Sequence, residues 1–430
     1  MRNLRPVTSI VLMLIFGSVA CLVSSCAKQQ PAWTCSAPFE LGEIGTLKGD
    51  LLYGTDDSTG EMLVCDTKTG KILWQRRIGD KFFSRTPVFR DQAGLICTVG
   101  HPDGNSNTSS KHLLAFDDRT GKLAWSMPVL KEPGRFHYKF NDGWLFAWED
   151  YQPKTITAVD LTTRKLVWRC QLPLTNAEKP DIDDIVAGPK AVAVALTQGP
   201  QKKLLLLQRN NGQILHSEQI GEIGAELSST GSVIFLNDAN LHVVKAIDLA
   251  AGKVAWQYVG QGTDKVMVAC PTGNETTKTV LVSVSTGSNL TRADFHALDP
   301  KSGRVLWSVP MEELGDFRYC RQFDNEALVV DTGKQLVALD QRTGEVRWRE
   351  PAADFIPSSY TNLVLAMTED NSFETFTITV IEPRGGKVIT KLRNPAGVTE
   401  ANQASIISDG KRLYLLKGTN DLVAMDIPQH

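Results

Sequence analysis

Six of the nine tryptophans in this chain of 430 residues each lie eight residues after an aspartate. The tryptophans are Trp74, Trp125, Trp168, Trp256, Trp307 and Trp348, and the aspartates are Asp66, Asp117, Asp160, Asp248, Asp299 and Asp340. Each pair encloses a variant of one phrase, D-x-x-T-G-x-x-x-W, for example DDRTGKLAW at 117–125. Self-similarity at a period of about 40 to 50 residues is typical of stacked supersecondary units. The chain is therefore predicted to form a single repeat domain, in which each unit packs on its neighbours.

Weaker copies of the phrase extend the repeat through the whole chain. QRNNGQILH at 208–216 and EPRGGKVIT at 382–390 fill two gaps in the series, and a truncated copy ends the chain at LVAMDIPQH. The anchor positions are then 66, 117, 160, 208, 248, 299, 340, 382 and 426. This series predicts nine units.

Each unit has the pattern of four short antiparallel strands, which is typical of a β-propeller blade. In D-x-x-T-G, the aspartate accepts backbone N–H groups of a turn, and the glycine supplies a positive φ. The tryptophan then falls on the outermost strand, where its ring is expected to cover the seam to the next blade. The alternative interpretation is a row of tryptophans that stacks a ligand.

The last unit, from about residue 400 to 427, ends before a fourth strand. Near the N-terminus, Trp33 and Cys35 repeat the spacing of Trp168 and Cys170 in a genuine fourth strand. We therefore expect residues 31–37 to complete the last blade and to remove two exposed sheet edges at once.

Residues 1–25 are predicted to be an export signal, because Arg2 and Arg5 precede an apolar run over 7–23. The sequence Val-Ser-Ser-Cys at 23–26 resembles a lipobox, so Cys26 is the predicted site of lipidation. The alternative is cleavage after Ala27 and release of a soluble protein. Residues 26–30 would then be a short tether and residues 31–430 the propeller.

Six cysteines remain after the predicted signal, and they are scattered through the repeats: Cys35, Cys65, Cys97, Cys170, Cys270 and Cys320. Cys270 and Cys320 occupy similar places in adjacent units. Export would allow a disulfide between them, but two buried thiols are the favoured interpretation.

The repeated phrase resembles that of the quinoprotein-like propeller superfamily, named for the pyrroloquinoline quinone (PQQ) alcohol dehydrogenases. That superfamily is typically eight-bladed, whereas nine anchors are counted here, so the resemblance leaves eight or nine blades open. A lipid-anchored propeller closed by its N-terminal strand resembles the BamB-like lipoproteins of the outer-membrane β-barrel assembly machinery. The resemblance implies a non-catalytic scaffold, held extracytoplasmically as a monomer within a larger complex of envelope proteins.

An enzyme of the quinoprotein class is the least favoured hypothesis. Such dehydrogenases use two adjacent cysteines against the quinone, and this chain has no adjacent cysteines and no C-x-x-C-H haem motif. The acidic run at 181–184 lacks the glycine and distal glutamate of a calcium loop and is predicted to be a solvated loop. We therefore predict no catalytic residue, metal or cofactor. A binder of small ligands or polysaccharides remains the second hypothesis.

Charge gives no indication of a nucleic-acid partner, because 46 basic residues balance 48 acidic ones. The longer connections are predicted to emerge on one face of the ring, where aromatic and charged residues suit a protein interface. The candidate partner-binding residues are Arg135, His137, Tyr138, Glu312, Glu313, Arg318 and Tyr319. For Phe136, Phe317 and Tyr319, packing between blades is an equally favoured role.

Overall fold

The computed structural model describes most of the chain from residue 30 onward. The described ranges are 30–47, 50–56, 58–79, 88–91, 93–102, 111–130, 136–149, 155–173, 180–198, 201–220, 228–230, 233–238, 242–261, 265–268, 279–286, 292–310, 319–323, 326–333, 335–351, 354–356, 362–369, 375–395 and 406–428. The predicted signal and Cys26 lie outside them. No helix in these ranges is long and apolar enough to cross a bilayer.

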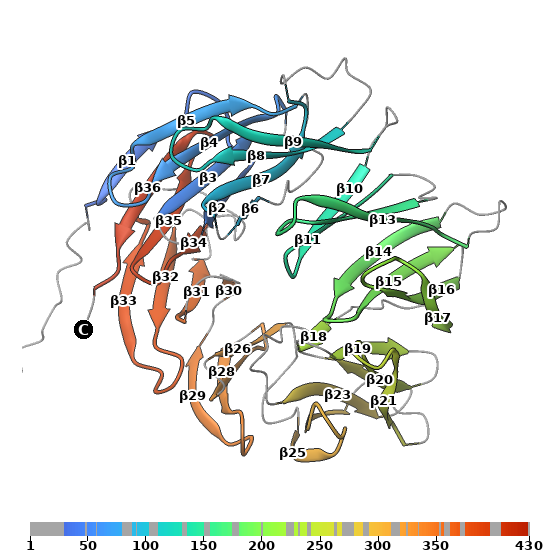
Figure 1. The fold of residues 1–430 in the computed structure, drawn as a ribbon. Coiled ribbons are helices and arrows are strands. Elements are labelled where there is room, and N and C mark those ends of the chain that lie inside the picture. The colour runs from blue at the N-terminus through green and yellow to red at the C-terminus, as the bar shows by residue number, and fades with distance from the viewer. Residues whose placement is uncertain are drawn as a thin grey trace, which may run out of the picture.

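The described strands form nine four-stranded antiparallel sheets that are arranged as blades around a ring (Figure 1). The all-β propeller is thus confirmed. Nine blades, and not the eight typical of the superfamily, match the count of sequence anchors.

The strand bounds, blade by blade, are as follows. Blades 1 to 3 contain β2 (Glu43–Leu47), β3 (Leu51–Asp56), β4 (Glu61–Asp66) and β5 (Ile72–Arg77); β6 (Phe89–Arg90), β7 (Leu95–Gly100), β8 (Lys111–Asp117) and β9 (Leu123–Leu130); β10 (Phe136–Asn141), β11 (Trp144–Glu149), β12 (Thr155–Asp160) and β13 (Lys165–Gln171). Blades 4 to 6 contain β14 (Pro180–Ala187), β15 (Ala191–Gln198), β16 (Gln201–Gln208) and β17 (Ile214–Ile220); β18 (Ser228–Thr230), β19 (Val233–Asp238), β20 (Val243–Asp248) and β21 (Lys253–Val259); β22 (Lys265–Val268), β23 (Val280–Thr286), β24 (Arg292–Leu298) and β25 (Val305–Pro310). Blades 7 to 9 contain β26 (Tyr319–Phe323), β27 (Ala327–Asp331), β28 (Gln335–Asp340) and β29 (Val346–Pro351); β30 (Asp354–Ile356), β31 (Val364–Glu369), β32 (Phe376–Ile381) and β33 (Val388–Arg393); β34 (Ile406–Ser408), β35 (Arg412–Lys417), β36 (Asp421–Asp426) and β1 (Trp33–Ser36).

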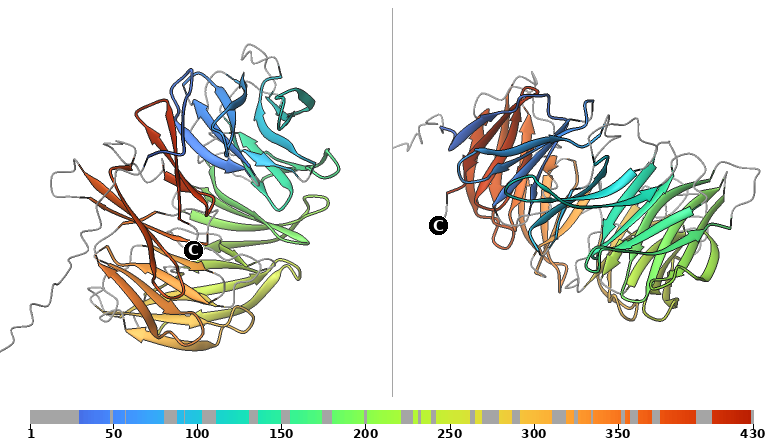
Figure 2. Two further views of the ribbon diagram at one scale, coloured as in Figure 1. Left: turned by 90° about the vertical axis from the view of Figure 1, so that its left-hand side faces the viewer. Right: turned by 45° about the horizontal axis from the view of Figure 1, so that its top comes forward.

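The N-terminal strand completes the ninth blade, as predicted. β1 pairs antiparallel with β36, from Trp33 opposite Ala424 to Ser36 opposite Asp421. In Figures 1 and 2 this blue segment lies against the red C-terminal blade. The two ends of the described chain therefore share one sheet, and neither β1 nor β36 is left without a partner strand.

A β-bulge before the tryptophan is built into the repeat. In blade 1, Val64 pairs with Trp74 while Cys65 pairs with Ile72, so Leu73 is the extra residue. A register shift lies at the corresponding place in blades 2 to 8. Because side chains alternate along a strand, one inserted residue reverses which face the following side chains take. The bulge thus aims the tryptophan at the next blade.

The hydrophobic core is divided among the seams between blades. One buried cluster joins Trp168 and Cys170 of β13 to Ile182 and Leu207 of blade 4. Another joins Trp33 of β1 to blade 1. Cys320 is buried, whereas Cys270 lies outside the described ranges, so their predicted relationship stays untested.

Candidate interaction surface

The ring has two faces that differ in their connections. We call the side with the D-x-x-T-G hairpins, between the third and fourth strands, the tight-turn face. The long-connection face carries the links from second to third strand and from one blade to the next. In blade 1, for example, the hairpin at 67–71 lies on the first face, whereas residues 58–60 and 37–42 lie on the second.

Tryptophans join each blade to the hairpin of the next one on the tight-turn face. Each ring donates its Nε1–H to the carbonyl of the residue that follows the next anchor. The pairs are Trp33 with Thr67 (2.9 Å), Trp74 with Asp118 (2.9 Å), Trp168 with Arg209 (2.6 Å), Trp256 with Pro300 (2.9 Å), Trp307 with Gln341 (2.9 Å) and Trp348 with Pro383 (2.8 Å). These indole rings take part in packing and hydrogen bonding within the fold.

Three seams depart from this rule, and in one of them, after blade 8, Thr390 of β33 takes the tryptophan position. Nε1 of Trp125 is buried without a hydrogen-bond partner among the described residues, and the guanidinium of Arg164 lies 5.7 Å from its ring centre. In blade 4, His216 takes the tryptophan position, and its Nε2 lies 3.6 Å from Glu218. The seams are thus chemically unequal although the blades share one topology.

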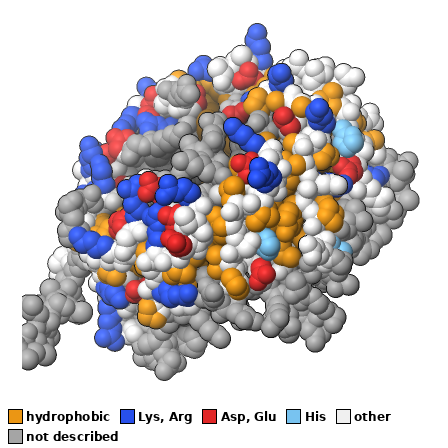
Figure 3. Space-filling view, turned by 90° about the horizontal axis from the view of Figure 1, so that it is seen from below, with side chains coloured by type: hydrophobic (Ala, Val, Ile, Leu, Met, Phe, Trp, Pro, Cys, Tyr) orange, Lys and Arg blue, Asp and Glu red, His pale blue; other side chains and the backbone are white. Residues whose placement is uncertain are grey.

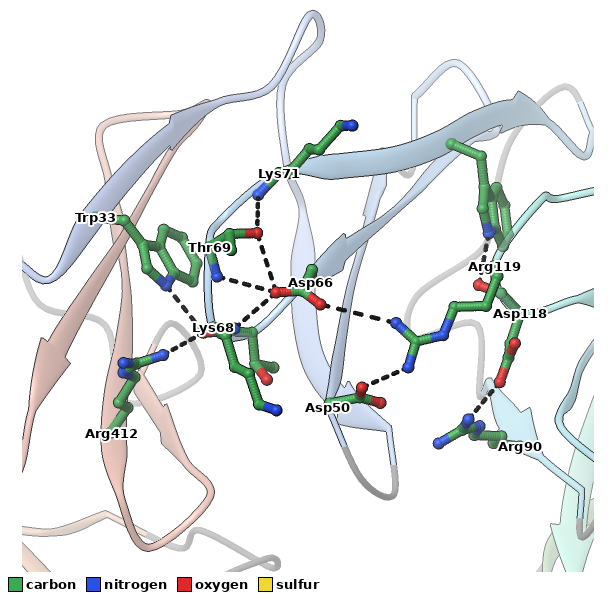
Figure 4. A network of polar contacts seen from close by, with 12 residues as sticks. Trp33, Asp50, Asp66, Lys68, Thr69, Lys71, Arg90, Asp118, Arg119 and Arg412 are labelled. Atoms are coloured by element: carbon green, nitrogen blue, oxygen red, sulfur yellow. Dashed lines mark hydrogen bonds and ion pairs between the residues drawn. The ribbon is translucent and has the colours of Figure 1, made fainter.

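Charged side chains on the tight-turn face are also paired within the fold (Figure 4). Arg119 of blade 2 bonds to Asp50 and lies 3.7 Å from Asp66, both in blade 1. Its hydrogen bond holds the pKa of Asp50 below the ordinary value. On the other side of blade 1, Arg412 donates to the Thr67 carbonyl at 2.7 Å. The carboxylates of this face act mainly as turn caps and ion-pair partners.

A hollow of about 700 Å³ opens on the long-connection face at blade 1. It lies between the segment after β1, the β3–β4 turn and the outer strand β5. Its lining residues are Pro38, Phe39, Ser58, Thr59, Glu61, Gln75 and Arg77. The hollow is therefore formed where the N-terminal strand enters the ring.

Hydrogen bonds within the fold hold the walls of this hollow in place. Buried Asp56 accepts hydrogen bonds from the backbone N–H groups and hydroxyls of Ser58 and Thr59, at 2.5 to 3.2 Å. Burial opposes ionisation, but these bonds outweigh it and keep the pKa of Asp56 below its ordinary value. Nε of Arg77 donates to the Gly79 carbonyl at 3.2 Å. With half-buried Phe39, the hollow offers an aromatic ring and an arginine, the usual anchors of protein interfaces.

Three of the seven predicted partner-binding residues lie in the described ranges, in the innermost strands β10 and β26. His137 is exposed and stacks on Trp148, with ring centres 5.8 Å apart. Tyr138 points to the opposite side of β10, where it is half-buried and meets Phe140 edge-on at 6.0 Å. Tyr319 begins β26. The other four lie outside the described ranges: Arg135, Glu312, Glu313 and Arg318. Whether the seven residues form one cluster therefore stays a prediction.

The acidic run at 181–184 is part of strand β14, so the predicted solvated loop was wrong. Asp184 pairs with Lys139 of blade 3, and Asp183 lies 3.2 Å from Lys202. This long strand extends over Pro180–Ala187, and its polar sequence obscured the strand pattern. In the part of the chain that the structure describes, no group of three or more His, Cys, Asp or Glu side chains could hold a metal.

Sequence reasoning also missed an apolar rim. All the large hydrophobic side chains that are exposed among the described residues lie on fourth strands: Leu166, Ile214, Leu215, Val254, Val259, Val305, Leu306, Val346 and Val388. Six of them belong to blades 4 to 6, and Figure 3 shows hydrophobic side chains gathered on the side of the ring seen from below. The sequence signal was an apolar residue two places before a repeat tryptophan, as at Leu166, Val254, Val305 and Val346.

A family model described as outer membrane protein assembly factor BamB matches residues 22–258, 109–310 and 291–429. The matches overlap because a repeat can be aligned in more than one register, and together they span nearly the whole chain. The chain belongs to the BamB family. A search of curated proteins found no match.

Solved propellers resemble the fold at low sequence identity. A eukaryotic initiation factor is 13% identical and covers 88% of this chain and 94% of its own, with a TM-score of 0.56. BamB from Moraxella catarrhalis is 14% identical, covers 93% of this chain and 100% of its own, and has a TM-score of 0.41. The quinohemoprotein alcohol dehydrogenase ADHIIG from Pseudomonas putida HK5 is also 14% identical, at 93% and 76% coverage and a TM-score of 0.46. The first likeness supports the propeller fold alone.

Proposed function

We propose that this propeller is a non-catalytic, lipid-anchored scaffold of the bacterial envelope that holds envelope proteins during outer-membrane protein assembly. Membership of the BamB family is the observation that carries the proposal. The lipid anchor would be Cys26, at the end of a five-residue tether that leads directly into β1. No cofactor takes part in this function.

The partner is proposed to bind the long-connection face. On the opposite face, the tryptophans hold blades together, and the described carboxylates are engaged mainly as turn caps and ion-pair partners. The hollow at blade 1 presents Phe39 beside Glu61 and Arg77, and exposed His137 lies on the same face two blades away. A rigid ring that presents separate anchor points can hold a partner without rearranging.

Site-specific photo-crosslinking in native cells tests this assignment. A photoreactive residue in place of Phe39 or His137 should capture an envelope protein that is identified by mass spectrometry as a component of barrel insertion. The same probe in place of Lys301, on the tight-turn face, is the matched control and should capture none. Capture from Lys301 alone would overturn the assigned face, and no capture from any position would remove support for the scaffold.

A second candidate function rests on the chemistry of the same hollow. An aromatic ring flanked by hydroxyl, amide and charged groups also suits a polysaccharide. Calorimetric titration of the purified propeller with envelope glycans separates the two hypotheses, because a saturable heat that is lost in Phe39→Ala would favour the glycan.

A further inference from the structure

Cys35 and Cys65 meet across the seam that closes the ring. Cys35 lies in β1 of blade 9, and Cys65 lies in β4 of blade 1. Both belong to one buried hydrophobic cluster, with exposed fractions of 7% and 0%. Both are free thiols in the structure.

Their juxtaposition follows from a fixed register between β1 and blade 1. Trp33 Nε1 donates to the Thr67 carbonyl at 2.9 Å, which pins the two segments at the tight-turn face. Cys35 lies two residues after Trp33, and Cys65 lies two residues before Thr67, both toward the long-connection face. Because side chains two residues apart share one face of a strand, both thiols point into the seam at the same height.

The two thiols influence one another's ionisation across the seam. A hydrogen bond between the two side chains lowers the pKa of Cys35, and the same contact together with burial raises the pKa of Cys65. In the docked seam, Cys35 is therefore the thiol that ionises more readily.

The seam between blades 3 and 4 provides an internal comparison. Cys170 follows Trp168 as Cys35 follows Trp33, and Leu207 occupies the place of Cys65 in the facing strand. Of the five cysteines in the described ranges, only Cys35 and Cys65 occupy facing positions of one seam.

We propose that Cys35 and Cys65 form a disulfide in the mature protein and thereby lock the closing strand onto blade 1. The inference rests on the envelope location proposed above, because that compartment is oxidising. The oxidant would be the disulfide form of a thiol–disulfide oxidoreductase. The Cys35 thiolate attacks that disulfide before β1 docks and releases one enzyme thiolate. The Cys65 thiolate then attacks Cys35 Sγ and expels the second, so that two protons and two electrons leave the pair.

Such a bond would act at the point where the anchor pulls on the ring. A load on the tether at residues 26–30 reaches β1 first, and β1 is held to β36 by non-covalent pairing. The disulfide would close the chain from 35 to 65 and pass the load to blade 1.

The test is a thiol map of the full-length protein extracted from the envelope under acid, with free thiols blocked at once. Tryptic peptides 29–48 and 49–68 each contain one of the two cysteines. Without reduction, they should appear as one linked species that is lighter than their sum by two hydrogens and disappears on reduction. Free thiols on both peptides would overturn the inference.

A second arm separates this inference from the proposed location. Purified, reduced protein is placed in a glutathione redox buffer, where the pair should oxidise while Cys170 stays free. Leu207→Cys should add a second linked species with Cys170. If the native pair remains reduced in this buffer, the geometry is wrong wherever the protein resides. Membrane fractionation of the same cells tests the location independently of either thiol result.

Discussion

The indole nitrogen of Trp33 lies 2.9 Å from the carbonyl oxygen of Thr67, 34 residues further along the chain. The same bond recurs from Trp307 to Gln341 at 2.9 Å, between two blades in the middle of the series. The seam that closes the ring is therefore constructed like an ordinary seam. A strand from the opposite end of the chain replaces the missing one with its docking residue in place.

The seam hydrogen bond can be isolated by replacing Trp307 with phenylalanine. Trp307→Phe keeps an aromatic ring but leaves the Gln341 carbonyl without its donor, which should cost about 1 to 3 kcal/mol of unfolding free energy. Trp307→Ala should cost about 3 to 5 kcal/mol, because the ring is lost as well. Chemical denaturation measures both. Trp125→Phe is the control, because its Nε1 has no described partner, and an equal loss there would contradict the role of the bond.

Glycine in the D-x-x-T-G hairpin serves two purposes, and comparison with a glycine in the β35–β36 turn separates them. Gly303 has φ +69°, and a Cβ atom there would lie 2.6 Å from the Trp256 ring. Gly418 has φ +62° but open space around it. Gly418→Ala should cost about 1 kcal/mol for backbone strain alone, whereas Gly303→Ala should add about 1 to 3 kcal/mol of overpacking. Denaturation midpoints compare the two, and equal losses would mean that the ring contact is relieved without cost.

Much of the fold, but little of the candidate site, could be predicted from the sequence. The repeat gave the blade number and the docking role because its residues recur at fixed spacing, and the closing strand followed from the position of Trp33. The hollow was not foreseeable, because Phe39 and Arg77 come from segments outside the repeated phrase. His137 and Tyr138 were grouped by adjacency, but neighbours in a strand take opposite faces. The two side chains can be assigned to opposite sides of the strand only once the bounds of β10 are known.

Removing the closing strand should destabilise the whole ring. Deletion of residues 31–37 exposes an edge of β36 and removes Trp33 and Cys35 from their buried cluster. We expect a clear fall in the thermal unfolding midpoint, measured by circular dichroism. Thr34→Ala alters an exposed side chain of the same strand and should leave the midpoint unchanged. An unaltered midpoint after the deletion would show that the β1–β36 pairing contributes nothing to stability.

Acid should weaken the blade 7 hairpin through Asp340. Burial opposes its ionisation, but hydrogen bonds from Arg347, Arg342 and Thr343 prevail and lower its pKa from 3.8 to about 2. Because the folded-state pKa is below the unfolded one, this stabilisation is present above about pH 4 and is lost as the pH falls toward 2. Asp340→Asn should therefore flatten the fall in stability over that window, by up to about 1.4 kcal/mol per pH unit. Denaturation curves at several pH values measure the slope, and Glu345→Gln controls for net charge. An unchanged slope would contradict the assignment.

Partner capture should depend on the charged connection between blades 6 and 7 and not on the stability of the ring. The combined variant Glu312→Gln, Glu313→Gln and Arg318→Gln removes the charges proposed to meet a partner there, so the yield of crosslinked partner should fall several-fold. The thermal midpoint should stay at the wild-type value, because charges that serve a partner and not the fold contribute little to stability. Lys68→Gln and Lys71→Gln on the tight-turn face form the matched control and should preserve capture. A parallel loss of capture and stability in the first variant would assign these residues to the fold and leave the hollow at blade 1 and His137 as the proposed anchor points.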